Sequence, residues 1–124
     1  MCSMSKYNLV MYVLINNSLG MSKGKIAAQA SHVVSSVTER MVKTRPDIWK
    51  VYSKNFHPKI ILRADKDTMD WAIKEYSNYD SSIWCEYVLD AGFTEVPENS
   101  LTAIAFCPID KKNVPTWLNK LKLL

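Results

Sequence analysis

The feature that most constrains the fold is an apolar run near the N-terminus, YNLVMYVLI at residues 7–15. Side chains of a strand point alternately to its two faces, and here both faces are apolar apart from Asn8. The run is shorter than a membrane span and lacks the flanks of a signal peptide. The sequence therefore predicts a central strand that other layers of the protein cover on both sides.

A helical pattern begins after the loop NNSLGMS. From Gly24 onward, apolar residues recur at spacings of three and four, and a polar row runs beside them. The helix is expected to end near Thr44, because Arg45 precedes Pro46, which can open a second short helix. The apolar stripe comprises Ile26, Ala30, Val33, Val34, Val37 and Met41, and the polar row comprises Lys25, Gln29, His32 and Ser36.

The rest of the chain alternates between the two kinds of pattern. It predicts strands at 60–64, 82–89 and 101–107, a helix at 65–79 and a final short helix within 111–124. This order indicates an α/β fold, a three-layer α-β-α sandwich around a small mixed four-stranded sheet. We expect a single domain over residues 1–124, with residues 1–6 as a flexible tail.

Charge is distributed unevenly along the chain. The net charge is +4, but residues 1–63 carry +8 and residues 64–124 carry −4. A basic half favours a polyanionic partner such as nucleic acid, and an uneven solvated surface is the alternative. The cysteines, Cys2, Cys85 and Cys107, form no CxxC pair, which disfavours a structural zinc site and suits a reducing, cytoplasmic compartment. We expect no metal and no cofactor.

Chemistry-bearing residues gather at one predicted edge of the sheet. Lys23 and Lys25 stand at the start of a helix, where cations oppose the helix dipole but strengthen a site for an anion. Asp90 directly follows the third strand, and it lies at the same edge if the first and third strands are parallel. A hairpin would then return Thr102 beside Asp90. The stretch does not match a P-loop, which disfavours a nucleotide triphosphatase.

Two segments carry a family resemblance, MSKGKIAAQASHVV at residues 21–34 and VLDAGFTEVPENSLTAIAF at residues 88–106. Both are similar to signatures of the type-2 peptidyl-tRNA hydrolases, and the resemblance runs from about Tyr7 to the C-terminal end. It implies a mixed four-stranded sheet flanked by helices, often in a homodimer. No apolar run is long enough to span a membrane, so we expect no membrane partner. It also implies hydrolysis of the ester that joins a peptide to its tRNA.

The resemblance also suggests roles for individual residues. Asp90 would orient the attacking water or accept its proton, and Lys23 would stabilise the oxyanion or hold the terminal phosphate. Thr94 and Thr102 would position the water or the ester, and Lys25 would bind the RNA backbone. The remaining matched residues would lie in the substrate-binding region: Gly24, Gln29, Ser31, His32, Ala91, Gly92 and Ser100. The sequence departs from the family pattern at Phe93, where arginine is common, and at Ala105 and Cys107.

Other interpretations of the same residues stay open. Asp90 before Ala91 and Gly92 is also a good turn former. A non-catalytic module that binds RNA or protein would keep the same fold and basic face. A nucleophilic hydrolase is disfavoured, because Ser31 and His32 are adjacent on a helix and point about 100° apart.

Overall fold

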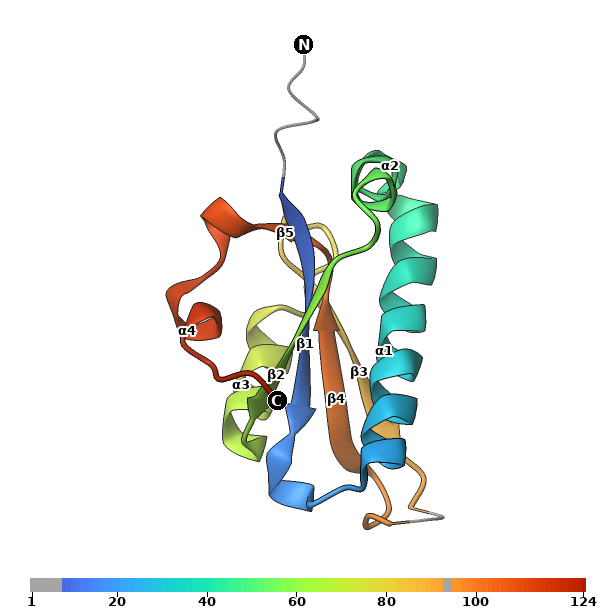
Figure 1. Ribbon diagram of the computed structural model, residues 1–124, viewed down its shortest axis with the longest axis vertical. Coiled ribbons are helices and arrows are strands. Elements are labelled where there is room, and N and C mark those ends of the chain that lie inside the picture. Colours follow the sequence, from blue (N-terminus) through green and yellow to red (C-terminus); the bar gives the residue numbers. More distant parts are fainter. Residues whose placement is uncertain (1–7, 93–94) are drawn as a thin grey trace.

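The computed structural model describes residues 8–92 and 95–124, so the tail expected at 1–6 lies outside the described residues, as do Phe93 and Thr94. Figure 1 shows the arrangement of the elements along the chain. The strands are β1 (Leu9–Asn16), β2 (Lys59–Ala64), β3 (Cys85–Asp90), β4 (Ser100–Phe106) and β5 (Ile109–Asp110). The helices are α1 (Lys23–Thr44), α2 (Pro46–Lys54), α3 (Lys66–Glu75) and α4 (Thr116–Asn119), with short 3-10 turns η2 (Asn17–Leu19) and η3 (Lys111–Asn113).

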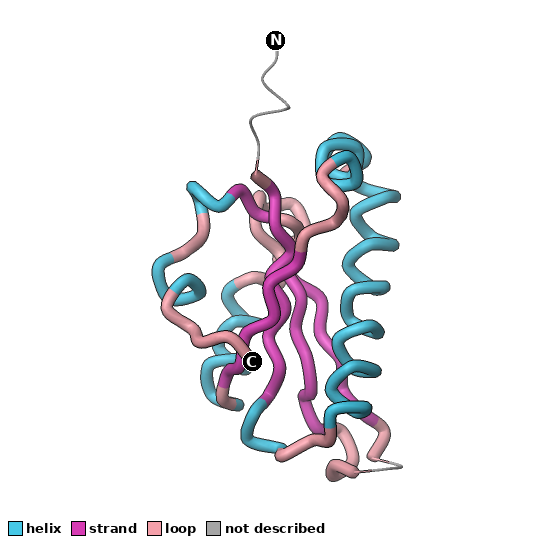
Figure 2. Tube along the Cα trace, viewed as in Figure 1, coloured by secondary structure: helices cyan, strands magenta, loops and turns pink. Residues whose placement is uncertain are grey.

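The strands form one mixed sheet in the order β2-β1-β4-β3, and β5 pairs with the beginning of β1. β1 is parallel to β2 and antiparallel to β4, which is antiparallel to β3. Helices α1 and α2 lie on one side of the sheet, and α3 and α4 lie on the other (Figure 1 and Figure 2). The predicted three-layer sandwich around a mixed sheet is therefore confirmed.

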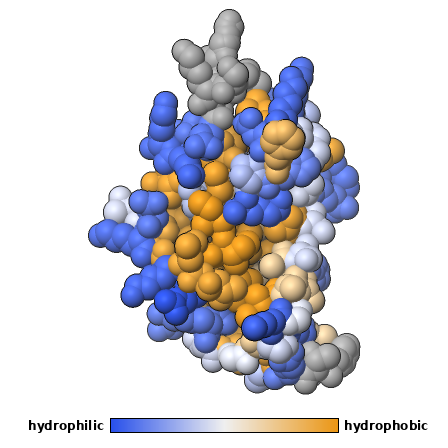
Figure 3. Space-filling view, viewed as in Figure 1, coloured by the Kyte–Doolittle hydropathy of each residue, from blue (hydrophilic) through white to orange (hydrophobic). Residues whose placement is uncertain are grey.

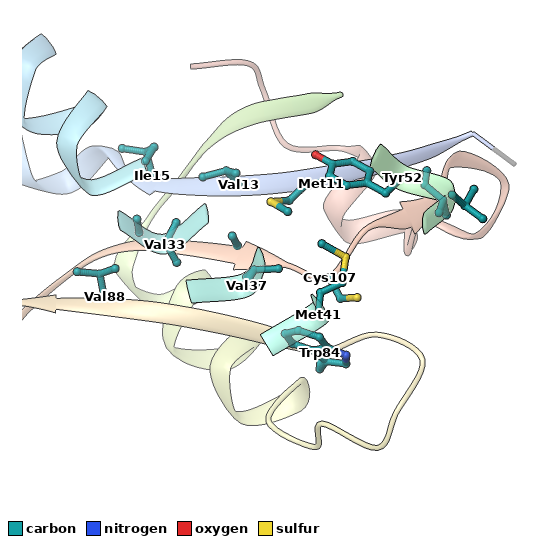
Figure 4. Close-up of a cluster of buried hydrophobic side chains, with 14 residues drawn as sticks. Met11, Val13, Ile15, Val33, Val37, Met41, Tyr52, Trp84, Val88 and Cys107 are labelled. Carbon is teal, nitrogen blue, oxygen red and sulfur yellow. The ribbon is translucent and has the colours of Figure 1, made fainter. Parts of the chain in front are cut away.

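The central position of β1 explains its double apolar pattern, because all eight of its residues are buried. Its odd-numbered residues pack against α1 and α2, in the core drawn in Figure 4, and its even-numbered residues pack toward α3 and α4. The first core contains Met11, Val13 and Ile15 with Val33, Val37 and Met41 of α1. The second contains Val10, Tyr12 and Leu14 with Met69, Ala72 and Leu118.

Helix α1 follows its predicted stripe closely. Val33, Val37 and Met41 are fully buried, and the other members of the stripe pack against the same core. Its first turn contains no acidic residue, as the sequence indicates, and Ser22 caps it by accepting the backbone N–H of Lys25 at 3.2 Å. Pro46 is the first residue of α2, in agreement with the expected boundary.

Two predicted boundaries are wrong. The helix expected at 65–79 ends at Glu75, because a polar turn follows in which Asn78 accepts the backbone N–H of Asp80 at 2.9 Å. The strand expected at 82–89 begins only at Cys85 and continues to Asp90, because residues 82–84 complete the bend that leads from this turn into the sheet. Elsewhere the predicted ends of strands and helices differ from the observed ones by only one or two residues.

The C-terminal part contains pairing that the pattern does not reveal. After β4 the chain turns to form β5, and the last residues then run beside β2. The backbone N–H of Arg63 donates to Lys122, and that of Leu124 donates to Ile61. This pairing covers the outer edge of β2, which would otherwise expose a row of backbone groups.

The two cysteines within the described ranges behave as small apolar core residues. Cys85 and Cys107 are buried, and burial raises the pKa of each thiol to about 12. Within residues 8–92 and 95–124, no helix is both long enough and apolar enough to span a membrane.

Candidate active site

The sheet brings the two predicted motifs to one edge. β1 and β3 run in the same direction because both are antiparallel to β4. Their carboxyl ends therefore meet at the edge where α1 begins and where the loop from 91 to 99 joins β3 to β4 (Figure 1). This is the edge at which open α/β sheets bind ligands, and the predicted convergence of the motifs is confirmed.

The centre of this site is the carboxylate of Asp90. Its Oδ1 accepts hydrogen bonds from Lys25 Nζ at 2.8 Å and from Gln29 Nε2 at 3.2 Å, and its Oδ2 accepts one from the backbone N–H of Gly92 at 2.8 Å. The Asp90 and Lys25 side chains are only 11% and 12% exposed. The Lys25 ammonium, followed by the Gly92 N–H, lowers the pKa of Asp90 below its ordinary value of 3.8.

A hydrogen-bonded chain leads from Asp90 into the sheet. Gln29 donates to Asp90 through Nε2 and accepts at Oε1 from the hydroxyl of Thr102 at 2.9 Å. Thr102 is fully buried, and its Oγ1 also lies 3.4 Å from the carbonyl oxygen of Val88. Because Thr102 holds the amide oxygen, the amide nitrogen is directed at the carboxylate.

The start of α1 receives its negative charge from the β3–β4 loop. The backbone N–H and the hydroxyl of Ser22 donate to the Glu95 carboxylate at 2.9 and 2.6 Å. These bonds lower the pKa of Glu95. Glu95 therefore compensates in part for the lysines at the helix start, and it ties the loop to α1. Glu95 was not identified from the sequence. The one signal for it is indirect: Ser22 caps a helix whose first turn contains no acidic residue.

The loop between Asp90 and Ser100 is tightly closed. Gly92 has φ +81°, and a Cβ there would lie 2.6 Å from backbone atoms of Glu98. The carbonyl oxygen of Asp90 accepts the backbone N–H of Asn99 at 2.7 Å, and the Ser100 hydroxyl donates to the carbonyl of Pro97 at 2.6 Å. Only glycine fits at position 92, and this geometry aims its N–H at the Asp90 carboxylate.

Other predicted site residues lie outside this hydrogen-bonded cluster. The Lys23 side chain is exposed at the first position of α1 and makes no hydrogen bond or ion pair with the described residues. Ser31 donates to the carbonyl of Ala27 within the helix, and His32 and Ala91 are exposed. No described residue packs closely on Gly24, because nothing lies within 4 Å of a Cβ built there.

Within the described ranges, no group of three or more His, Cys, Asp or Glu side chains is arranged to hold a metal ion. What the cluster does provide is an ionised carboxylate, an adjacent ammonium and a fixed amide at an accessible sheet edge. Such groups can orient a water molecule and stabilise a developing negative charge.

The fold and this cluster define the class: an α/β sandwich with a polar site at the carboxyl edge of its sheet. A family model described as peptidyl-tRNA hydrolase PTH2 matches residues 9–124. The chain belongs to this family, as its two motifs predict.

Named relatives agree with this assignment. The chain is 27% identical over 121 residues to a peptidyl-tRNA hydrolase of Thermococcus onnurineus, a match that covers 98% of this chain and all of that protein. It is 28% identical over 116 residues to a peptidyl-tRNA hydrolase of Methanocaldococcus jannaschii, covering 92% and 98%. It is 31% identical over 117 residues to a probable peptidyl-tRNA hydrolase 2 of Drosophila melanogaster, covering 94% of this chain and 62% of that protein.

Proposed function

We propose that this protein hydrolyses the ester bond between a peptide, or an N-blocked amino acid, and tRNA, and so releases free tRNA for reuse in translation. Family membership supports the reaction class. The observation that carries the assignment to particular residues is the Asp90 carboxylate, held by Lys25, Gln29 and the Gly92 N–H at the edge of the sheet.

Asp90 acts mainly by orienting the attacking water. A general base works best when its pKa is near the working pH, whereas the pKa of Asp90 is lowered by its neighbours. Its carboxylate remains ionised at neutral pH and accepts a hydrogen bond from the water, which directs the water oxygen at the ester carbonyl. Water adds to the carbonyl carbon, the ester C–O bond breaks, and the ribose oxygen leaves with one of the two protons of that water.

The two lysines take different positions in this mechanism. Lys25 lies at the reacting centre, where its ammonium stabilises the oxyanion that forms on the carbonyl oxygen. Lys23 is exposed at the helix start, where it suits the terminal phosphate of the tRNA. Of the two roles considered for Lys23 from sequence, the geometry favours phosphate binding, and the oxyanion role passes to Lys25.

Thr102 and Gln29 position the carboxylate. Thr102 is too deeply buried to touch the ester in this conformation, and its hydroxyl instead fixes the Gln29 amide. Gly92 contributes its N–H to the same carboxylate. Thr94, which lies outside the described residues, keeps its proposed role in positioning the water. The neighbouring residues suited to substrate contact are Gly24, Ala91, Ser100, Ser31 and His32.

The test is release of free tRNA from N-blocked aminoacyl-tRNA by the wild type and by Asp90→Asn, which keeps the shape and removes the charge. Asp67→Asn on α3 is the matched control, and circular dichroism checks folding. We expect cleavage by the wild type and the control and a loss of at least about 100-fold in Asp90→Asn. Equal rates would refute the role of Asp90. Salt-dependent tRNA binding without cleavage by any variant would instead identify a non-catalytic binding module.

We further propose that the protein acts in the cytoplasm as a homodimer. Apolar side chains gather in the middle of the face shown in Figure 3, where Figure 1 places β2 and the C-terminal end. Leu123 and Leu124 are 70% and 52% exposed there. A second copy would cover them. Analytical ultracentrifugation of the wild type and of Leu123→Glu tests this proposal. We expect the wild type to sediment as a dimer and Leu123→Glu as a monomer. A wild type that sediments as a monomer would refute the dimer.

A further inference from the structure

A second surface of interest is the turn that follows α2, residues 55–58. Phe56 is 93% exposed, far more than any other large apolar side chain among the described residues. Both Phe56 and His57 have positive φ angles, +68° and +55°. Positive φ is uncommon for any residue except glycine and is especially unfavourable for a bulky residue such as Phe56. Such strained positions persist where the surrounding structure enforces them.

The surrounding structure does hold this turn in place. The His57 ring stacks on Tyr52, with centroids 5.6 Å apart and planes at 19°, and lies 5.2 Å from the Trp49 ring. The carbonyl of Pro58 accepts from the Tyr52 hydroxyl at 2.9 Å and from the backbone N–H of Met11 at 3.0 Å. With its neighbours anchored in this way, Phe56 is presented to solvent in a defined conformation.

The chain on both sides of this turn is rich in positive charge. Residues 41–63 contain six Lys or Arg and one acidic residue, Asp47, which pairs with Arg45 at 3.0 Å. Lys50 and Lys54 of α2 are exposed and make no side-chain hydrogen bond or ion pair within the described ranges. Lys50 and Lys54 are one helical turn apart and share a face of α2. An exposed aromatic ring among free ammonium groups is the chemistry that binds a nucleobase and its phosphates.

The turn and the candidate active site belong to the same helical layer. Lys25, near the start of α1, contacts Asp90, and α2 follows the other end of α1 (Figure 1). The 18 residues from Lys25 to Lys43 correspond to about 27 Å of helix. An ester with a single nucleotide cannot reach from one end to the other, whereas a polynucleotide can.

We propose that this surface, Phe56 with Lys50 and Lys54, binds the RNA part of the substrate at a distance from the scissile ester. Phe56 stacks on a nucleobase that is unpaired or ends a duplex, and the lysines contact phosphates. The inference rests on the proposed function, since it assigns the polynucleotide of that substrate to a second surface.

The first experiment measures binding of deacylated tRNA by fluorescence anisotropy at fixed salt for wild type, Phe56→Tyr and Phe56→Asn. Asparagine tolerates positive φ, so Phe56→Asn removes the ring without disturbing the turn. We expect Kd to rise about tenfold in Phe56→Asn and to stay near wild type in Phe56→Tyr, which can still stack. Because no cleavage is required, this result is independent of the proposed hydrolysis.

A second measurement compares kcat/KM for N-acetylaminoacyl-tRNA and for the same N-acetylaminoacyl ester of adenosine. Phe56→Asn should reduce the preference for the full-length substrate about tenfold, through KM. The slope of log Kd for tRNA against log salt concentration should fall by about two in the double variant Lys50→Gln/Lys54→Gln, because two phosphate contacts are lost. The control variant Lys74→Gln/Lys120→Gln, on the opposite side of the sheet, should keep the wild-type slope.

Unchanged tRNA affinity and unchanged substrate preference in Phe56→Asn would overturn the inference. A protein partner would then be the alternative ligand of this surface. If the wild type cleaves neither substrate but Phe56→Asn weakens tRNA binding, the proposed hydrolysis fails while the RNA surface stands. The two proposals are therefore separable.

Discussion

Replacing Thr102 by valine tests whether the hydrogen-bonded chain behind Asp90 sets its position. Valine has nearly the same shape, but it cannot donate to Gln29 Oε1, the acceptor that lies 2.9 Å away. Thr102 is fully buried and Gln29 is 7% exposed, so water cannot readily replace the lost donor. Removing the bond and leaving a buried oxygen without a donor costs about 2 kcal/mol. For a chain of this size, the melting temperature should fall by about 5–8 °C.

The same substitution should reduce turnover beyond its effect on stability. Without Thr102, the Gln29 amide is free to rotate, and its nitrogen no longer points steadily at Asp90. We expect kcat on N-blocked aminoacyl-tRNA to fall about 10- to 100-fold with little change in KM, at a temperature where the variant is folded. Thr102→Ser keeps the hydroxyl and should recover most of kcat. A folded Thr102→Val with wild-type kcat, or a Thr102→Ser as slow as Thr102→Val, would refute this reasoning.

Three other predictions concern pH, the β3–β4 loop and the helix cap. Because the folded pKa of Asp90 is lowered, its contribution to stability is fully present above 3.8, the ordinary value, and is lost as pH falls through the folded pKa. Melting temperature against pH should show an acid limb below that value, and Asp90→Asn should reduce it; parallel curves would contradict the ion pair. Gly92→Ala should lower the free energy of unfolding by about 2–3 kcal/mol, because of its positive φ and the clash of the new Cβ with Glu98. Gly24→Ala, with free space around it, should raise the free energy of unfolding by about 0.5–1 kcal/mol, and denaturant titrations measure both. Similar effects of the two substitutions would rule out the strained loop. Glu95→Gln should weaken its bonds to Ser22, so amide exchange in the first turn of α1 should accelerate while the last turn is unaffected.

Local patterns in the sequence predict the main elements because their physical causes are local. The β1 run is apolar on both faces, so it requires two covering layers, and both cores are present. The spacing of Val33, Val37 and Met41 predicts the buried face of α1. The ends of α3 and β3 were less predictable, because turn-forming side chains between them compete with regular backbone hydrogen bonds.

The sequence also predicts the region of the site, since Asp90 and the lysines follow strand ends that meet at one edge. It does not predict which lysine is the partner of Asp90. Lys23 and Lys25 are two residues apart on a helix, so they point in very different directions, and only the packing of α1 on the sheet decides which one meets the carboxylate. The Glu95 cap has the same origin, because a contact across 73 residues depends on how the loop closes.

By itself, then, the sequence determined the layers, the central strand, the basic half and the edge of the sheet where the chemistry gathers, because each follows from side-chain periodicity or strand direction. Only the tertiary structure decided that Lys25 pairs with Asp90, that Thr102 donates to Gln29 and that Phe56 projects from an anchored turn. Each of these depends on the distance and orientation between segments far apart in the chain, which periodicity does not encode.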